Sequence, residues 1–313
     1  MVSQRKFNEL EISTNSRLHF GFLNLDSQQP YSYGSMGLTI NKHKTLIQIS
    51  KSKKFHSNLS KIYTNKIKDF IKTMKLDSNV NINCSVKPDS HVGLGSGTQL
   101  AMALEEGVSK FYKFGTVKNI FSRKFRSGVG YNAYLKGGFI IDCPKNNSKS
   151  NELIFNRNFP KKWKIILLFD RNIKGLSGKK ESNFFSLKQS SSNREKLSDI
   201  VLNEIIPSLI YEDFDIFANG LTRFQKLNSL FYSSIQKSYF LSNDIGKVIK
   251  KISSKFNIAS GQSSWGPTSY IIVDSETNLN EILSILDNTI SMYNSLSYDV
   301  VSAANNGRRI SYK

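Results

Sequence analysis

Apolar and polar positions along the chain follow two short periods, one typical of strands and one typical of helices. Between Val80 and Val86 every second residue is apolar or cysteine, which predicts a strand with one buried face. Residues 58–75 place their apolar side chains at steps of three and four, which predicts an amphipathic helix. That helical stripe consists of Leu59, Tyr63, Ile67, Phe70 and Met74.

The same two periods recur to the end of the chain. They predict further strands at residues 8–13, 17–25, 37–49, 139–143, 163–170, 270–274 and 298–303. They predict further helices from Thr98 through Phe111 and at residues 193–211, 214–232 and 279–290. Residues 144–151 are polar and predict a loop near a domain boundary. Because strands and helices are mixed and neighbouring strands look antiparallel, the fold class is α+β.

Length and composition predict a globular protein. A chain of 313 residues with 39% hydrophobic residues is long enough for two domains with cores of their own. No apolar run approaches the roughly 20 residues that span a bilayer, and Met1–Leu10 lacks the apolar centre of a secretory signal. Cys84 and Cys143 form no ligand-spaced cluster and no disulfide framework. We therefore expect a cytoplasmic protein that contacts no membrane.

The formal net charge of +20 allows three interpretations. The lysines are scattered along the chain, which favours solvated helix faces in a Lys-rich and Asn-rich composition. A positive field that attracts a polyanionic substrate is the second interpretation. Nucleic-acid binding is the third, and the scatter argues against it because such proteins gather their basic residues on one face. No nucleic-acid partner is expected.

Pro88–Leu100 carries the strongest chemical signal. Glycines at positions 93, 95 and 97 let backbone N–H groups converge on an anion, and the helix that follows adds the positive end of its dipole. Hydroxyls of Ser96 and Thr98 suit phosphate oxygens or Mg²⁺. No Gly-Lys-Ser/Thr follows, so this is not a Walker loop. The alternative is a tight strand-to-helix turn that needs glycine only for its shape.

Four segments resemble a known family, the β-ribofuranosylaminobenzene 5′-phosphate synthases of the GHMP kinase superfamily. The segments occur in order over most of the chain, and the second and fourth are the most specific. They are Arg17–Leu25, His91–Leu100, Arg126–Gly130 with Gly137–Asp142, and Gly261–Thr268.

The resemblance implies a two-domain GHMP kinase fold. Residues 1–156 would form an N-terminal domain like the second domain of ribosomal protein S5, with the glycine-rich loop, and residues 157–313 a ferredoxin-like domain. It also implies a reaction that joins phosphoribosyl pyrophosphate to 4-aminobenzoate, or to 4-hydroxybenzoate, and releases CO₂ and pyrophosphate in tetrahydromethanopterin biosynthesis. Mg²⁺ is the expected cofactor. Whether the enzyme is a homodimer stays open.

The resemblance also suggests roles for individual residues. The expected catalytic residues are Arg17, His19, Asp26 and Arg126. The expected phosphate-binding residues are Gly93, Leu94, Gly95, Ser96, Gly97, Thr98, Ser127 and Gly128. The expected substrate-binding residues are Ser263, Ser264 and Trp265, and the hydroxyls of Ser96 and Thr98 are expected near the metal.

Four of these residues have plainer alternatives. Arg17 could pair with Asp26 for structure alone, and His19 could be a half-buried strand histidine. Arg126 could be an ordinary surface arginine. Trp265 could pack in the core instead of stacking on the aryl ring.

An ATP-dependent small-molecule kinase is the alternative function. Several GHMP kinases carry an aspartate base in the third segment, where this chain has Gly130. The phosphate loop also reads Ser96-Gly97-Thr98 instead of paired serines, and both departures favour the synthase. The chain departs from the synthase pattern as well, because Tyr31–Ser35 lacks an expected arginine. A basic nucleic-acid-binding protein that kept only the fold is the third possibility.

Overall fold

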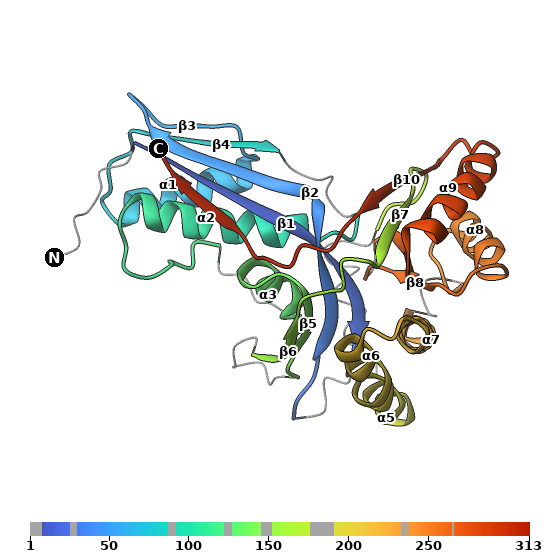
Figure 1. Cartoon of the computed structure of the whole chain (residues 1–313). Helices are drawn as coiled ribbons and strands as arrows, with labels where there is room; N and C mark the ends of the chain where they lie inside the picture. Colours follow the sequence, from blue (N-terminus) through green and yellow to red (C-terminus); the bar gives the residue numbers. More distant parts are fainter. Residues whose placement is uncertain are drawn as a thin grey trace.

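The computed structural model contains two sheets, the first mostly and the second wholly antiparallel (Figure 1). Side chains from both sheets contribute to one apolar core. Arrays of helices cover the outer face of each sheet. The structure describes residues 8–25, 30–86, 92–121, 127–144, 152–175, 191–232, 236, 238–264 and 266–313.

The first sheet is built around two long antiparallel strands, β1 (Glu9–Phe22) and β2 (Ser35–Lys51). Both strands are bent by register shifts, which fall in β1 between Thr14 and Ser16 and between His19 and Gly21. The strand order is β11-β1-β2-β4-β3, and β5 and β6 extend the sheet from the first residues of β2. The remaining strands are β3 (His56–Ser57), β4 (Val80–Val86), β5 (Phe139–Asp142), β6 (Leu153–Arg157) and β11 (Arg309–Tyr312).

Three helices cover one face of the first sheet. They are α1 (Lys61–Thr73), α2 (Ser96–Phe111) and α3 (Val129–Leu135). In Figure 1 α2 runs along β1 and β2, and α3 lies beside its N-terminal half. The apolar stripe of α2 packs on alternate residues of β1 and β2, such as Ile12 and Ile47, which is the packing that the period of each element requires.

The second sheet has the order β10-β7-β9-β8, and its strands are antiparallel. Helices cover both of its faces, so β7 is buried on both sides: Ile165 and Leu167 face one core and Ile166 and Leu168 the other. The strands are β7 (Lys164–Asp170), β8 (Ala259–Gln262), β9 (Ser269–Val273) and β10 (Leu296–Val301). The outer face is covered by α8 (Asn243–Ser253) and α9 (Glu276–Ile290).

A second group of helices fills the space between the sheets. Phe217 of α7 contacts Phe139 of the first sheet as well as Phe159 and Trp163, which lie just before β7. This aromatic cluster therefore joins the two halves of the molecule. The helical segments are α5 (Ser191–Ile200), the π-helix η1 (Val201–Ile205), α6 (Ile206–Tyr211), α7 (Phe214–Ser229) and the 3₁₀ turn η2 (Leu230–Tyr232).

The C-terminal residues return from the second sheet to the first. After β10 the chain crosses to β1, where β11 pairs with it as an edge strand. The predicted division between residues 156 and 157 stays a prediction, and β11 shows that the first sheet also uses residues from the far end of the chain. In the part that the structure describes, no helix has the length and apolarity to cross a membrane.

Most of the elements expected from the sequence are present, with differences in detail. The two strands expected at 8–13 and 17–25 are one bent strand, and α2 begins at Ser96 instead of Thr98. The helix expected at 193–211 is confirmed, with a π-helical turn inside it. The sequence analysis missed β3, β6, α8, β8 and β11, and it gave no range for the helix α3. The expected loop at 144–151 lies outside the described residues except for its first residue.

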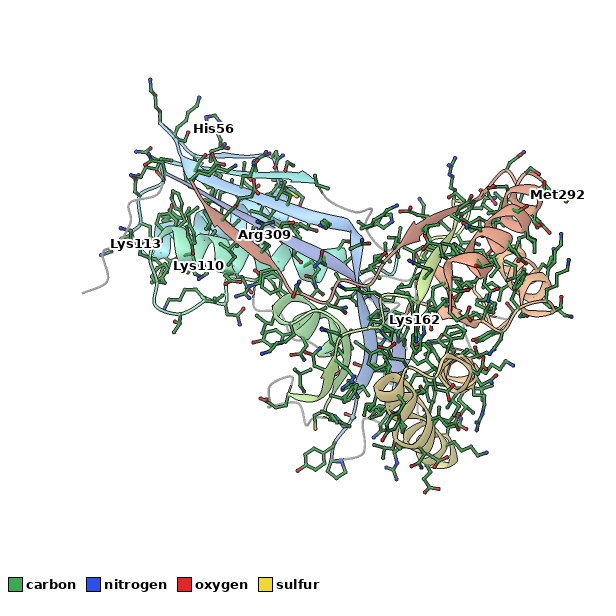
Figure 2. The ribbon with its side chains drawn as sticks, viewed as in Figure 1. His56, Lys110, Lys113, Lys162, Met292 and Arg309 are labelled. Atoms are coloured by element: carbon green, nitrogen blue, oxygen red, sulfur yellow. The ribbon has the colours of Figure 1, made fainter. Side chains whose placement is uncertain are left out.

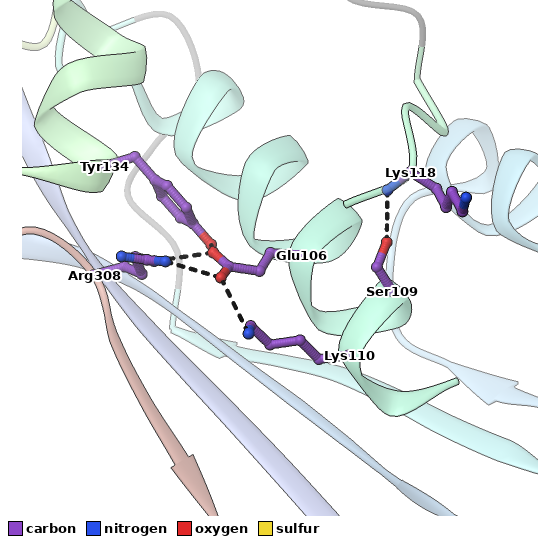
Figure 3. A network of polar contacts seen from close by, with 6 residues as sticks. All are labelled: Glu106, Ser109, Lys110, Lys118, Tyr134 and Arg308. Carbon is purple, nitrogen blue, oxygen red and sulfur yellow. Dashed lines mark hydrogen bonds and ion pairs between the residues drawn. The ribbon is translucent and has the colours of Figure 1, made fainter. Parts of the chain in front are cut away.

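A buried polar network ties the C-terminal residues to α2 and α3 (Figure 3). The Glu106 carboxylate on α2 accepts hydrogen bonds from Arg308 Nε and Nη2, both at 2.9 Å, and from the Tyr134 hydroxyl on α3 at 2.7 Å. Lys110 Nζ lies 3.8 Å from the same carboxylate. Burial alone would raise the pKa of Glu106, but the bonds from Arg308 and Tyr134 outweigh it and lower that pKa. The network thus holds α3 against α2.

Phe217→Ala should strongly destabilise the fold. It removes a buried ring from the cluster that joins the two halves, a change that typically costs about 3–5 kcal/mol. Urea denaturation followed by circular dichroism measures the loss. Ile216→Ala is the matched control, because that neighbouring side chain is 47% exposed and its loss should change the unfolding free energy far less. Equal losses for both variants would contradict this account of the core.

Glu106→Gln should cost about 2 kcal/mol at neutral pH, because it weakens charge-assisted hydrogen bonds. The pKa of Glu106 is lower in the folded chain than its ordinary value of 4.5, so the stabilisation is complete above pH 4.5. It is lost as the pH falls through the folded pKa. The difference between wild type and variant in denaturation experiments should therefore shrink on acidification. Glu281→Gln, on an exposed position of α9, controls for the change in net charge.

Candidate active site

The glycine-rich loop leads directly into the N-terminus of the 16-residue helix α2. Gly93 and Gly95 have φ values of +89° and +76°, a region that residues with a Cβ atom rarely adopt. Gly95 is the N-cap of α2, and the first backbone bonds of the helix, from Thr98 and Gln99, end on its carbonyl. The loop therefore has the strand-to-helix geometry and the helix dipole that an anion site needs. Residues 88–91 of the expected loop lie outside the described residues.

The loop packs backbone to backbone on the turn at residues 263–268. A Cβ on Gly93 would lie 2.6 Å from the carbonyl oxygen of Ser263 and 2.9 Å from the Cα of Gly266. The Ser263 hydroxyl donates to the Gly93 carbonyl at 2.7 Å, and the Thr268 hydroxyl donates to the Val92 carbonyl at 2.6 Å. The second and fourth sequence segments are thus in direct contact.

Arg17 supports the same loop from the side of β1. Its Nη1 donates to the Gly93 carbonyl at 2.6 Å, and its backbone N–H donates to the Leu94 carbonyl at 3.1 Å. A Cβ on Gly95 would lie 3.0 Å from the guanidinium carbon, so the side chain lies flat against the loop. Arg17 therefore shapes the anion loop, whereas its expected contact with a phosphate or carboxylate stays a prediction. Asp26, its alternative partner, lies outside the described residues.

His19 lies beside this loop and is fully buried, not half-buried as the plainer alternative supposed. Its backbone N–H donates to the Ser263 hydroxyl and its carbonyl accepts from the Ser264 N–H, both at 3.0 Å. Neither ring nitrogen has a hydrogen-bond partner in the structure, which covers all of β1 and the turn apart from residue 265. Burial first, and then the charge of Arg17, hold the pKa of His19 well below 6.5. The ring is thus neutral at physiological pH.

The third segment lies on the same face of the sheet as His19. His19 is paired with Gly37 on β2, and a Cβ on Gly37 would point at Val129 of α3. Cross-strand partners present their side chains on one face, so the His19 ring points towards the α3 side. A Cβ on Gly130 would lie 3.1 Å from the Thr98 methyl carbon, and Gln99 Nε2 donates to the Gly130 carbonyl at 2.8 Å.

Two residues that the sequence analysis did not single out position Ser127 and Gly128. The buried Asp142 carboxylate accepts from the Ser35 N–H at 2.8 Å, from the Ser35 hydroxyl, and from the Gly128 N–H at 2.5 Å. Ser35 Oγ in turn lies 2.6 Å from Ser127 Oγ. The sequence contained one signal for Asp142, because it is a single acidic residue after the apolar run Phe139–Ile141. A buried carboxylate needs hydrogen-bond donors around it.

The stretch that lacks the expected arginine folds back on the end of β1. Tyr33 N–H donates to the Asn24 carbonyl and Leu23 N–H to the Gly34 carbonyl, both at 2.5 Å, and Asn24 Nδ2 donates to the Tyr31 carbonyl at 2.8 Å. The segment around Tyr31 is therefore held by backbone bonds and brings no cation of its own to this place. Phe22 and Tyr33 pack edge to face beside it, and the Phe22 ring lies 4.6 Å from that of His19.

Apart from Asp26, the expected site residues come from four segments of the sequence. The structure brings together all of those residues that lie in its described part. Direct hydrogen bonds link five of them, which are Arg17, His19, Gly93, Ser263 and Ser264. Leu94, Gly95, Ser96, Gly97 and Thr98 continue the same loop and helix, and Ser127 and Gly128 join it through α3. Arg126 and Trp265, like Asp26, lie outside the described residues.

The described residues provide hydroxyl groups for a metal ion but no cluster of carboxylates. Among them, no group of three His, Cys, Asp or Glu side chains lies close enough together to hold an ion. Asp142 is already occupied by three donors. Mg²⁺ usually retains several waters and binds through one or two carboxylates together with substrate phosphates. The hydroxyls of Ser96 and Thr98 stay the expected contacts of the ion, and the Mg²⁺ site stays a prediction, because Asp26 and Asp89 lie outside the described residues.

Comparison with known proteins agrees with the resemblance of the four segments. No family model matches the chain. It is 27% identical over 297 residues to a curated protein named beta-ribofuranosylphenol 5′-phosphate synthase from Methanothermobacter thermautotrophicus, covering 85% of this chain and 89% of that one. A protein of the same name from Methanocaldococcus jannaschii is 26% identical, covering 94% of this chain and 98% of the other.

Solved structures show the same fold at low sequence identity. Homoserine kinase from Cytophaga hutchinsonii matches with a TM-score of 0.68 and 13% identity, covering 99% of this chain and 100% of the other. Phosphomevalonate kinase from Streptococcus pneumoniae matches with a TM-score of 0.69 and 9% identity, covering 95% of this chain and 100% of the other. The chain thus has the GHMP kinase fold, and along most of its length it is similar to the proteins named beta-ribofuranosylphenol 5′-phosphate synthase.

Proposed function

We propose that this chain transfers the ribose 5-phosphate group of phosphoribosyl pyrophosphate to a para-substituted benzoate, with release of CO₂ and pyrophosphate. The observation that carries the proposal is its similarity, over 85–94% of its length, to proteins named as such synthases. The name of these proteins specifies a phenol, so 4-hydroxybenzoate is tested beside 4-aminobenzoate. The convergence of all four segments on one loop supports a single site for this chemistry.

The proposed reaction balances without any net transfer of protons. The bond between the anomeric carbon and the pyrophosphate oxygen breaks, and its electron pair leaves with the pyrophosphate. The ring carbon that carries the carboxylate forms the new carbon–carbon bond. When CO₂ leaves, the electron pair of its bond returns to the ring. The chemistry thus needs charge stabilisation at the leaving group and exclusion of water more than it needs a strong acid or base.

The loop at residues 93–98 is proposed to hold the pyrophosphate. Its carbonyls at Val92 and Gly93 are occupied by Thr268, Ser263 and Arg17, so the protein fixes the loop shape before any anion arrives. The helix dipole of α2 favours the negative charge that develops on pyrophosphate. The hydroxyls of Ser96 and Thr98 would hold a Mg²⁺ ion carried by the pyrophosphate, and that ion would offset the negative charge of the leaving group.

His19 is proposed to form a hydrogen bond with the substrate. Its buried ring is neutral, so one nitrogen donates and the other accepts, and both lack partners in the described chain. A neutral imidazole suits a reaction with no net proton transfer. It can accept the proton of a 4-hydroxyl group as the ring attacks and return that proton when CO₂ leaves.

A kinase is the second candidate, and the fold favours it because homoserine kinase and phosphomevalonate kinase share that fold. Against it stands Gly130. This position faces Thr98 at the start of α2, and glycine provides no carboxylate there to activate an accepting hydroxyl. The two candidates differ in the products they release.

The purified chain, incubated with phosphoribosyl pyrophosphate, Mg²⁺ and either 4-hydroxybenzoate or 4-aminobenzoate, should release CO₂ and pyrophosphate in equal amounts. Carboxyl-labelled benzoate measures the CO₂, and a coupled phosphate assay measures the pyrophosphate. Release of neither product with any para-substituted benzoate would reject the synthase. ADP formation from ATP that depends on a hydroxylated metabolite would favour the kinase.

His19→Ala should lower kcat/KM by about 10²-fold, the usual effect of removing one catalytic hydrogen-bonding group, with little loss of folded protein. His56→Ala is the control, because that exposed histidine lies on β3 far from the loop (Figure 2). Because the pKa of His19 lies well below 6.5, lowering the pH from 8 to 7 should not protonate it or reduce the rate through it. An unchanged rate in His19→Ala would remove His19 from the mechanism.

A further inference from the structure

A pocket with a volume of about 400 Å³, open to solvent on one side, lies at the far end of the first sheet, beside α5 and η1. This is within the size range of small-molecule sites. Its floor comes from the sheet, with Leu23 after β1 and Ile141 on β5. Its wall comes from Val201 and Leu202 of the π-helix and from Ile206 at the start of α6. π-helical turns occur often at functional sites.

This pocket is separate from the candidate active site. Ile141 is paired with Met36, and both side chains belong to the core that α5 and α7 cover. Ile140 packs instead against Val129 of α3, on the face where His19 lies. None of the residues that line the pocket belongs to the anion loop or to the turn at residues 263–268, and His19 is not among them, so the pocket is a different place on the molecule.

Exposed apolar side chains gather at the rim of the pocket. Tyr31 is 55% exposed, Ile154 is 51% exposed and Leu202 is 60% exposed, and all three line the same hollow. A folded chain exposes scattered apolar residues without consequence, but a cluster around a concavity marks a place where an apolar group binds.

One cation lines the pocket among these apolar groups. Arg194 on α5 is half-buried, and in the described part of the chain no carboxylate forms an ion pair with it. The other side chains in the lining that carry polar groups are Ser198, one turn further along α5, Asn24 and Tyr31. A guanidinium beside apolar walls is suited to a carboxylate, sulfonate or phosphate attached to an apolar body.

We propose that this pocket is a second binding site, for a small anion with an apolar body, in which Arg194 holds the anionic group. The apolar body lies between Leu202, Ile154 and the floor of the sheet. A protein partner fits this feature less well, because the binding surface is concave and of small-molecule size. The proposal does not depend on the synthase activity.

The probe is 1-anilinonaphthalene-8-sulfonate, which combines an aromatic body with one sulfonate and fluoresces on transfer to an apolar site. Titration of the full chain should give saturable binding of one probe per chain. Arg194→Gln should weaken that binding by about tenfold, the loss expected for one charge-assisted hydrogen bond. Ser198→Trp should abolish it by filling the pocket. Lys196→Gln removes the same charge from an exposed position of the same helix and should leave the affinity within twofold.

Thermal unfolding confirms that each variant is folded before its titration is interpreted. Binding that is not saturable, or that is equal in wild type and Arg194→Gln, would overturn the proposal. So would displacement of the probe by phosphoribosyl pyrophosphate, because the probe would then occupy the transfer site. A chain that sediments as a dimer and becomes monomeric in Leu202→Glu would identify the pocket as an interface instead. Product release by Arg194→Gln should match wild type, so this test and that of the synthase fail independently.

Discussion

The close packing of Gly93 on Gly266 is the constraint on which the candidate site depends. A Cβ on Gly266 would lie 2.3 Å from the Gly93 Cα, so two segments far apart in the chain meet only because both are glycine there. Arg17 and Ser263 then donate to the Gly93 carbonyl. Because the Gly93 carbonyl oxygen is already hydrogen-bonded to the protein, its lone pairs are not left to repel an incoming anion. Contacts from both halves of the molecule thereby fix the shape of the loop that is proposed to bind the anion.

The same contact fixes His19. The backbone N–H of His19 donates to the Ser263 hydroxyl, and its carbonyl accepts from the Ser264 N–H. The position of the ring therefore follows from that of the turn. Burying two ring nitrogens without partners costs free energy, which a purely structural residue such as leucine would not incur. A substrate group that completes those bonds offsets this cost only when it is bound. The free-energy cost of these two unpaired ring nitrogens therefore argues for a functional role of His19. Neither the sequence nor the burial of the ring would provide that argument alone.

The sequence predicted what local patterns determine and missed what tertiary contacts determine. The continuous apolar run of β7 and the helical stripe of α2 follow from period alone. The missed helix α8 has buried residues Ile245, Val248, Ile249 and Ile252 at helical spacing, so the same rule would have found it. Strand β11 is different: Arg309–Tyr312 is short, both of its end residues are exposed, and it is a strand only because the edge of β1 is available. The support that Arg17 gives to the loop was equally invisible, because its partner is a backbone carbonyl 76 positions away.

The C-terminal residues show why the site cannot be assigned to one half of the chain. A Cβ on Gly307 would lie 2.4 Å from the Leu135 carbonyl oxygen at the end of α3, and Arg308 holds Glu106 on α2. Both contacts press α3 onto α2, and α3 presents Gly130 to Thr98 at the anion loop. Residues beyond position 300 thus set the distance between two segments of the first half. The early strands and helices provide most groups of the candidate site. The turn at residues 263–268 and the C-terminal residues hold those groups in place. The four segments are therefore spread over most of the chain instead of lying in one part of it.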